Sequence, residues 1–227
     1  MTHLEPELEI LKKDLIEMLR LVISQFVKCK DATFNADADL AKEVISKEKR
    51  VNSLELTIDK RCENILALHN PVATDLRFVL ASYKIANDME RMGDNAESIA
   101  NFLFDVMEKA EEEMIVKFKL SMMFDVAISM LTDMEEALVN EDTKLARKIF
   151  KKDDFLNENN RNGAGIAEEL IQKYPSKIKL ILKLLSIIRK LERVGDLAKN
   201  IGEEVIFHLE AKVLKHKKDQ KKKGKKK

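Results

Sequence analysis

Two stretches of this chain, 102 residues apart, repeat both a pentapeptide and the helical pattern around it. The sequence ERMGD at residues 90–94 returns as ERVGD at residues 192–196. Eight positions spaced by three or four residues run through each copy, and fifteen of these sixteen positions are apolar. They are Phe78, Ser82, Ile85, Met89, Met92, Ala96, Ile99 and Leu103 in the first copy, and Leu180, Leu184, Ile187, Leu191, Val194, Ala198, Ile201 and Val205 in the second. This spacing is typical of an amphipathic helix, and its return in the same register predicts an internal repeat.

The composition favours helices throughout the chain. There are only six Gly, three Pro and no Trp among 227 residues, and 36% of the residues are charged. Such a composition is typical of long helices rather than sheet. Pro71 and Pro175 each separate two helical patterns. We predict six helices, at roughly residues 5–29, 36–69, 73–107, 113–139, 142–173 and 177–213.

The expected fold is all-α, with two tandem, pseudo-symmetric three-helix bundles of long antiparallel helices. The connections expected near residues 30–35, 70–72, 108–112, 140–141 and 174–176 are short, which favours antiparallel neighbours. We predict a first bundle over residues 1–110, a second over residues 111–213, and a lysine-rich disordered tail over residues 214–227.

The charge of the chain is unevenly distributed. Residues 212–227 contain ten Lys and one Asp, a net charge of +9, so the total of +1 leaves −8 for the remainder. We interpret the lysine block as a solvated end, with peripheral contact to an anionic membrane as the functional alternative. Specific nucleic-acid binding is not expected because an acidic body repels phosphates.

The cysteine content and the apolar runs indicate a soluble cytoplasmic protein. Cys29 and Cys62 are too few for a disulfide framework and are expected to be packing residues. The charged N-terminus shows no signal-peptide core, and no apolar run approaches the length of a membrane-spanning helix. We expect such a protein to work at the inner face of the membrane through its partners.

Each repeated pentapeptide pairs two carboxylates on one helix face. Glu90 and Asp94, like Glu192 and Asp196, are four residues apart, and like charges at this spacing repel. The glycine within each pair costs about 1 kcal/mol in a helix interior relative to Ala. We therefore expect either a neighbouring helix or a bound ion to approach the backbone closely there.

The preceding helix of each half offers matching oxygen donors. They are Glu48, Asn52, Glu55 and Asp59 in the first half, and Asp153 and Asn157 in the second. Carboxylate and amide oxygens that converge from two helices suit Mg²⁺, Ca²⁺, Mn²⁺ or iron. The alternative is that these are ordinary solvated surfaces of a metal-free helical scaffold.

Several enzyme classes lack their motifs in this sequence. None of the four histidines completes the Glu-x-x-His motif of ferritin-like di-iron proteins. The sequence also shows no Gly-rich phosphate loop, no CxxC pair and no Ser or Cys nucleophile motif. We expect a protein that is not an enzyme, with a metal-dependent hydrolase using the same carboxylates as the alternative.

Residues 70–100, NPVATDLRFVLASYKIANDMERMGDNAESIA, closely resemble the signature of the PhoU family of phosphate-uptake regulators. IRKLERVGDLAKNIGEEV in the second half resembles the second copy of that signature, and the similarity covers residues 1–210. The resemblance implies tandem three-helix bundles whose E(D)xxxD motifs hold multinuclear metal clusters, most often iron, with Mn, Mg, Ni or Zn as alternatives. It also implies a negative regulator of phosphate-starvation signalling, with the ATPase subunit of a phosphate ABC transporter and a sensor histidine kinase as partners. Whether copies of the chain assemble into a homo-oligomer is left open.

The family motif transfers to this sequence only in part. Both pairs within the pentapeptides match, whereas Asn52 and Asn157 stand where the family has Asp. The Glu55 and Asp59 pair is a literal match one heptad further on, and Asn160 and Ala164 in the second half do not match it. We therefore expect two metal clusters with different numbers of ligands. The predicted metal ligands are Glu48, Asn52, Glu55, Asp59, Glu90, Asp94, Asp153, Asn157, Glu192 and Asp196.

Overall fold

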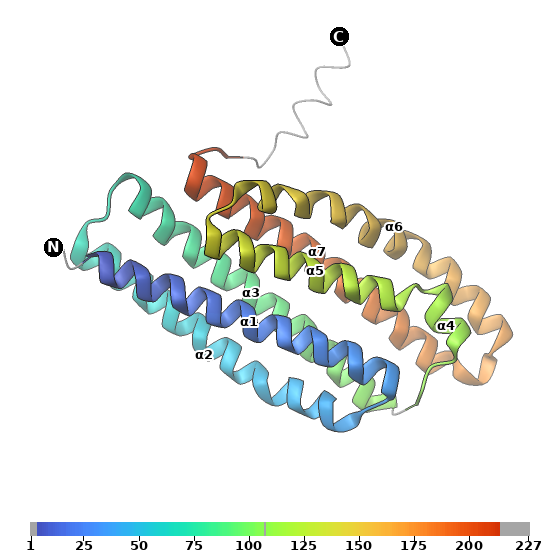
Figure 1. The fold of residues 1–227 in the computed structure, drawn as a ribbon. Coiled ribbons are helices and arrows are strands. Elements are labelled where there is room, and N and C mark those ends of the chain that lie inside the picture. The colour runs from blue at the N-terminus through green and yellow to red at the C-terminus, as the bar shows by residue number, and fades with distance from the viewer. Residues whose placement is uncertain (1–3, 107, 214–227) are drawn as a thin grey trace, which may run out of the picture.

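The computed structural model describes residues 4–106 and 108–213, and these ranges are almost entirely helical. Figure 1 shows long helices that run alongside one another. Their bounds are α1 Leu4–Asn35, α2 Ala38–His69, α3 Ala73–Val106, α4 Glu112–Lys117, α5 Leu120–Asn140, α6 Thr143–Lys173, the 3₁₀ turn η1 Pro175–Lys177, and α7 Ile178–Glu210. The all-α prediction is confirmed.

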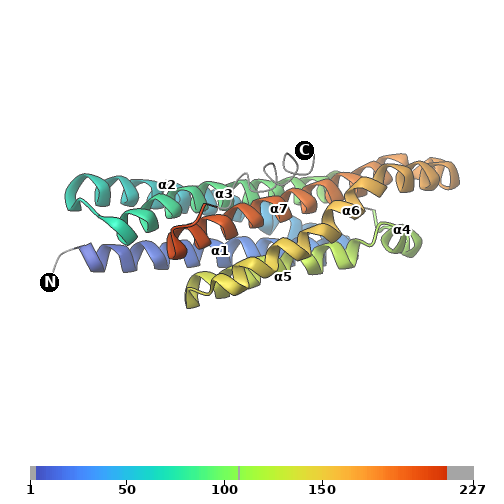
Figure 2. The ribbon, with the colours of Figure 1, turned by 90° about the horizontal axis from the view of Figure 1, so that it is seen from above.

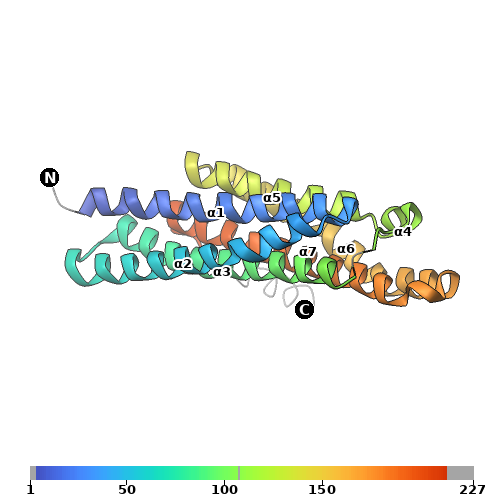
Figure 3. The same cartoon turned by 90° about the horizontal axis from the view of Figure 1, so that it is seen from below.

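Two three-helix bundles lie side by side. Helices α1, α2 and α3 pack together, as do α5, α6 and α7, and the bundles meet where α3 contacts α7 and α1 contacts α5. The contacting helices α3 and α7 are antiparallel, because Arg77 Nε donates to the His208 carbonyl at 3.2 Å while Lys183 Nζ lies 3.1 Å from Asp105 Oδ2. The turned views show an elongated molecule with α4 at one end (Figures 2 and 3).

The predicted apolar stripes form the core of both bundles. All eight stripe positions on α7 are buried, and so are six of the eight on α3. Phe78 and Leu103 are partly buried and pack against that core. Cys29 and Cys62 are free thiols buried among apolar side chains, as predicted. The helical periodicity therefore identified the side of α3 and of α7 that faces their neighbours.

The loop predicted near residues 30–35 is wrong. Helix α1 continues to Asn35 because Ala32 and Thr33 are buried against the core and the Thr33 hydroxyl donates to the Cys29 carbonyl at 2.6 Å. The chain turns instead at Ala36, whose φ is 52°. The Asp37 carboxylate then caps α2 by accepting from the Asp39 and Leu40 amides.

The helix predicted at residues 113–139 is divided in two. Lys119 adopts a left-handed conformation with φ of 49° and separates α4 from α5. The break is held by tertiary contacts: Phe118 is fully buried, and Asn159 on α6 donates its amide to the Phe118 carbonyl at 2.7 Å. The last helix also ends earlier than predicted, at Glu210, with Ala211 in the left-handed region.

The predicted lysine-rich tail over residues 214–227 lies outside the described residues. Within the described ranges, none of the helices is both long enough and apolar enough to cross a membrane.

Candidate metal-binding faces

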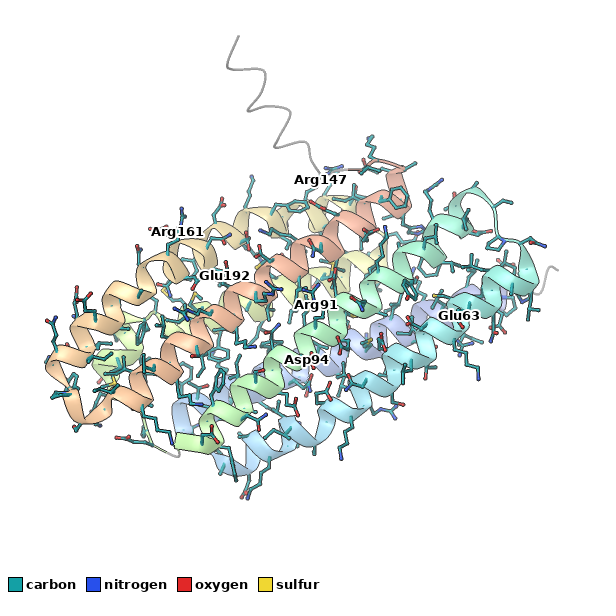
Figure 4. The ribbon with its side chains drawn as sticks, turned by 180° about the vertical axis from the view of Figure 1, so that it is seen from behind. Glu63, Arg91, Asp94, Arg147, Arg161 and Glu192 are labelled. Atoms are coloured by element: carbon teal, nitrogen blue, oxygen red, sulfur yellow. The ribbon has the colours of Figure 1, made fainter. Side chains whose placement is uncertain are left out.

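Helices α2 and α3 bring acidic side chains together along one side of the first bundle. We call this group the first acidic face: Glu48, Asn52, Glu55 and Asp59 on α2, with Glu90, Asp94 and Glu97 on α3. Glu48 is only 5% exposed. Burial raises the pKa of Glu48, and the negative charges of Glu97, Asp94 and Glu90 raise it further. The two helices therefore face each other as the sequence predicted, and Figure 4 labels Asp94 on α3.

Several oxygens of the first acidic face have no hydrogen-bond partner. Asn52 Nδ2 donates to Glu48 Oε2 at 2.7 Å, but Glu48 Oε1 and Asn52 Oδ1 are buried without a partner. Asp59 Oδ1 is in the same state. An unpaired buried acceptor costs about 1–3 kcal/mol of folding free energy. A bound group that these oxygens could coordinate would remove that cost. That property fits a hard cation.

The remaining acids of α2 divide between two surroundings. Burial raises the pKa of Glu90 on α3, and the charges of Asp94 and Glu55 raise it further. Glu55 of α2 therefore lies near the carboxylates of α3. Burial also raises the pKa of Asp59, followed by the charge of Glu63. The predicted ligand Asp59 thus lies one turn further along α2, beside another carboxylate of its own helix.

The glycines of the repeated pentapeptides are explained by neighbouring helices. A Cβ atom at Gly93 would lie 3.0 Å from Val51 Cγ1 on α2. At Gly195 it would lie 2.7 Å from Leu156 Cδ1 and 2.8 Å from Asp153 Oδ1 on α6. Of the two sequence-based explanations, close helix packing accounts for both glycines.

The equivalent side of the second bundle contains its own cation. We call it the second acidic face: Asp153 and Asn157 on α6, with Glu192, Asp196 and Lys199 on α7. Lys199 Nζ lies 2.5 Å from Asp153 Oδ2 and 2.6 Å from Asp196 Oδ1. Asn157 Nδ2 also donates to Asp153 Oδ2.

Glu192, the third carboxylate of this face, accepts a hydrogen bond from Asn160. Burial and the charge of Asp196 raise the pKa of Glu192, and the Asn160 bond opposes them. Figure 4 shows Glu192 on α7. Each of the three carboxylates of the second acidic face therefore has at least one protein partner, although Asp153 Oδ1 is buried without one.

Neither face is a fully assembled metal site. Within residues 4–106 and 108–213, no three His, Cys, Asp or Glu side chains are arranged closely enough to hold an ion. The structure thus brings most of the predicted ligands onto two facing helix pairs but does not converge them on one point. Metal binding stays a prediction. Three buried oxygens without a partner support it in the first bundle, and the second bundle has one, Asp153 Oδ1.

The ligand prediction left out three residues that shape these faces: Glu97, Lys199 and Asn160. The repeat offset of 102 residues could have found the first two, since it places Glu97 and Lys199 at equivalent positions with opposite charge. Asn160 stands at the second-half counterpart of Glu55, but its contact with Glu192 could not be predicted because it depends on how α6 packs on α7.

Comparison with known proteins assigns the family. The PhoU domain matches residues 15–103 and again residues 120–205. Phosphate-specific transport system accessory protein PhoU homolog 1 of Thermotoga maritima is 34% identical over 206 residues, which are 90% of this chain and 88% of that protein. The Escherichia coli accessory protein PhoU is 30% identical over 213 residues, covering 92% of this chain and 86% of its own.

Solved structures agree with this assignment. The crystal structure of PhoU from Pseudomonas aeruginosa superposes with a TM-score of 0.86 at 28% identity, over 92% of this chain and 99% of that chain. PhoU from Streptococcus pneumoniae, described as a phosphate transport system regulatory protein, gives a TM-score of 0.80 at 26% identity, over 93% and 99% of the two chains. The doubled domain, the sequence relatives and the shared architecture together place this chain in the PhoU family.

Proposed function

We propose that this protein is an accessory regulator of phosphate transport, acting through contacts with the ATPase subunit of a phosphate ABC transporter and with a sensor histidine kinase. The observation that carries this proposal is the PhoU domain, which matches both halves of the chain. The names of the relatives describe accessory or regulatory proteins of phosphate transport. In this role the protein lowers the expression of phosphate-starvation genes when phosphate is plentiful.

The regulatory role is tested by deleting the gene in its own host. We expect phosphate-starvation genes to be expressed at high phosphate in the deletion strain and repressed again by the full chain supplied in trans. The purified full chain should also retain the transporter ATPase subunit and the kinase on an affinity surface. Normal repression in the deletion strain, together with no retention of either protein, would contradict the proposal.

We also propose that the first acidic face binds a metal ion. Its support is the set of buried oxygens without a partner, Glu48 Oε1 and Asn52 Oδ1, beside the carboxylates of Glu90 and Asp94. Such a ligand set of oxygens alone suits iron(II), Mn²⁺ or Mg²⁺. A bound cation supplies positive charge that offsets the repulsion among these carboxylates and draws α2 and α3 together.

Elemental analysis of protein purified without added metal or an affinity column tests this second proposal. The matched variant changes Glu48, Glu90 and Asp94 to Ala and is first checked for helicity by circular dichroism. We expect a transition metal in the native chain and its loss in the variant. Metal at background in the native chain, even after incubation with iron(II) or Mn²⁺, would contradict metal binding while leaving the regulatory role intact.

A further inference from the structure

The two acidic faces differ in charge at one equivalent position. Glu97 on α3 and Lys199 on α7 are related by the repeat offset of 102 residues. Each acts on the buried carboxylate of the preceding helix. In the first bundle that partner is Glu48, on which Glu97 is the strongest charged influence. In the second bundle it is Asp153, which Lys199 contacts at 2.5 Å.

Lys199 satisfies the second acidic face from within the chain. Its ammonium group bridges carboxylates from two helices, Asp153 on α6 and Asp196 on α7. Asp153 has a side chain only 4% exposed, so an unpaired negative charge there would carry a large desolvation penalty. The second oxygen of Asp153, Oδ1, is buried without a hydrogen-bond partner and lies 2.8 Å from where a Cβ at Gly195 would stand. The ammonium group therefore already contacts Asp153 Oδ2 and Asp196 Oδ1, two of the oxygens that an outside cation would need on this face.

Among the described residues, no basic side chain bridges the carboxylates of the first acidic face as Lys199 bridges those of the second, although the charge of Arg91 lowers the pKa of Glu90. Arg91, the nearest basic residue along α3, pairs with Asp88 at 3.3 Å. Lys190 and Arg193 from α7 line an open polar cleft of about 420 Å³ together with Asp94 and Glu97. Among the described residues, neither Lys190 nor Arg193 forms an ion pair with Glu48, Glu90, Asp94 or Glu97. Glu48 Oε1 remains buried and unpartnered, on the side of α2 that faces these carboxylates.

We propose that Lys199 is a built-in cation that takes the place of a metal ion in the second bundle, so that this chain binds metal only at the first acidic face. The proposal rests on the metal binding proposed above and specifies which of the two repeats carries it. A divalent ion could enter the second face only by displacing the ammonium from two carboxylates, and the displaced charge would still repel it from a short distance.

The test measures Mn²⁺ bound per chain by equilibrium dialysis, with Mn²⁺ as the probe for a hard divalent cation. The matched pair is Glu90→Gln and Glu192→Gln, which remove equivalent carboxylates from the two repeats. We expect Glu90→Gln to weaken Mn²⁺ binding by at least about tenfold and Glu192→Gln to change it by less than about twofold. Equal weakening by both variants would overturn the proposal, because it would mean that both faces bind metal.

Substitutions at Glu97 and Lys199, the equivalent positions of opposite charge, give an independent test by the same Mn²⁺ measurement. Lys199→Gln removes the internal cation and should add one Mn²⁺ per chain, whereas Glu97→Lys should weaken binding at the first face at least about tenfold. The control is Lys183→Gln, another α7 lysine of similar exposure that pairs with Asp105. This control should leave the Mn²⁺ count unchanged.

The outcomes separate this inference from the proposal beneath it. If the native chain binds no Mn²⁺ but Lys199→Gln binds one, Lys199 does exclude the cation and only metal binding by the first face is refuted. If Lys199→Gln, shown to be folded by circular dichroism, gains no Mn²⁺, the inference is overturned whether or not the native chain binds metal.

Discussion

Glu48 concentrates the electrostatic strain of the first acidic face in one side chain. It is nearly inaccessible to solvent, and its pKa is raised above the ordinary value of 4.5 by burial and then by Glu97, Asp94 and Glu90. The folded state therefore binds the Glu48 proton more tightly than the unfolded chain does. The ionised carboxylate destabilises the metal-free fold at neutral pH, and this destabilisation disappears as the pH falls through the raised pKa.

This sign gives a prediction for Glu48→Gln. Without metal, the variant should be more stable than the native chain at pH 7 by about 1 kcal/mol. The difference should shrink as the pH falls toward 4.5 and be absent below it. Urea denaturation across this range in the presence of a chelator measures the effect. A variant less stable than the native chain at pH 7 would contradict this prediction, because it would mean that the ionised Glu48 carboxylate stabilises the metal-free fold.

Glu43 provides the opposite control on the same helix. Hydrogen bonds from Lys28 and Lys47 lower its pKa, so its contribution to stability is present above the ordinary value and is lost on acidification. Glu43→Gln should therefore destabilise the protein at pH 7, with the loss fading at low pH. The contrast between the two variants separates the acidic face from a general response to charge removal.

Helix packing explains why Gly93 and Gly195 stand inside long helices, whereas it does not explain Gly165. In α7, a methyl group at Gly195 would meet Leu156 and Asp153, neither of which can easily move. Leu156 is fully buried, and Asp153 is held by Lys199 and Asn157. In α6, by contrast, Gly165 has nothing within 4 Å of a Cβ position.

We predict opposite effects for alanine at these two positions. Gly165→Ala should stabilise the protein by about 0.5–1 kcal/mol, because Ala is the better helix former and meets open space. Gly195→Ala should destabilise it by about 1 kcal/mol, because overpacking costs about 1–3 kcal/mol and outweighs the gain in helix propensity. Equilibrium denaturation of both variants measures the difference. If Gly195→Ala proves stabilising, α6 and α7 are further apart than described.

The two bundles share apolar contacts along the seam between α3 and α7. At one end of the seam, Phe102 and Leu103 of α3 line a small cavity with Leu180, Leu184 and Ile187 of α7. At the other end, Phe78 packs against His208 with ring centroids 5.0 Å apart. Between these ends, Lys84 Nζ lies 3.2 Å from Glu204 Oε2. Separating the bundles would expose this surface to water.

We therefore predict that residues 4–106 and 108–210 unfold together. Native-state hydrogen exchange followed by mass spectrometry should give the same opening free energy for the slowest amides of α3 and of α7. Ile187→Ala, at a fully buried position beside the seam, should lower the opening free energy of both by about 2–5 kcal/mol. Independent opening energies would instead support the division at residue 110 as a boundary between separate folding domains.

The sequence alone determined the helical class, the duplication and the buried side of the two helices, α3 and α7, that carry the repeated pentapeptide. These features follow from local periodicity, since a side chain at every third or fourth position must share one face of a helix. The sequence also placed both carboxylates of each repeated pentapeptide on one helix face, because residues four apart project from the same side of a helix. For the same reason it assigned Gly93 and Gly195 to positions of close approach, although not to what approaches.

The tertiary structure decided everything that depends on contacts between distant residues. The extension of α1 through Thr33 depends on burial against the core. The break at Lys119 depends on the burial of Phe118 and on the hydrogen bond from Asn159 to the Phe118 carbonyl. Local helix propensity contains no information about either contact. The charge balance of the two faces was decided in the same way. Glu97 and Lys199 are ordinary charged residues in the sequence, and only the packing of α3 on α2 and of α7 on α6 places one against a carboxylate that it repels and the other against one that it neutralises.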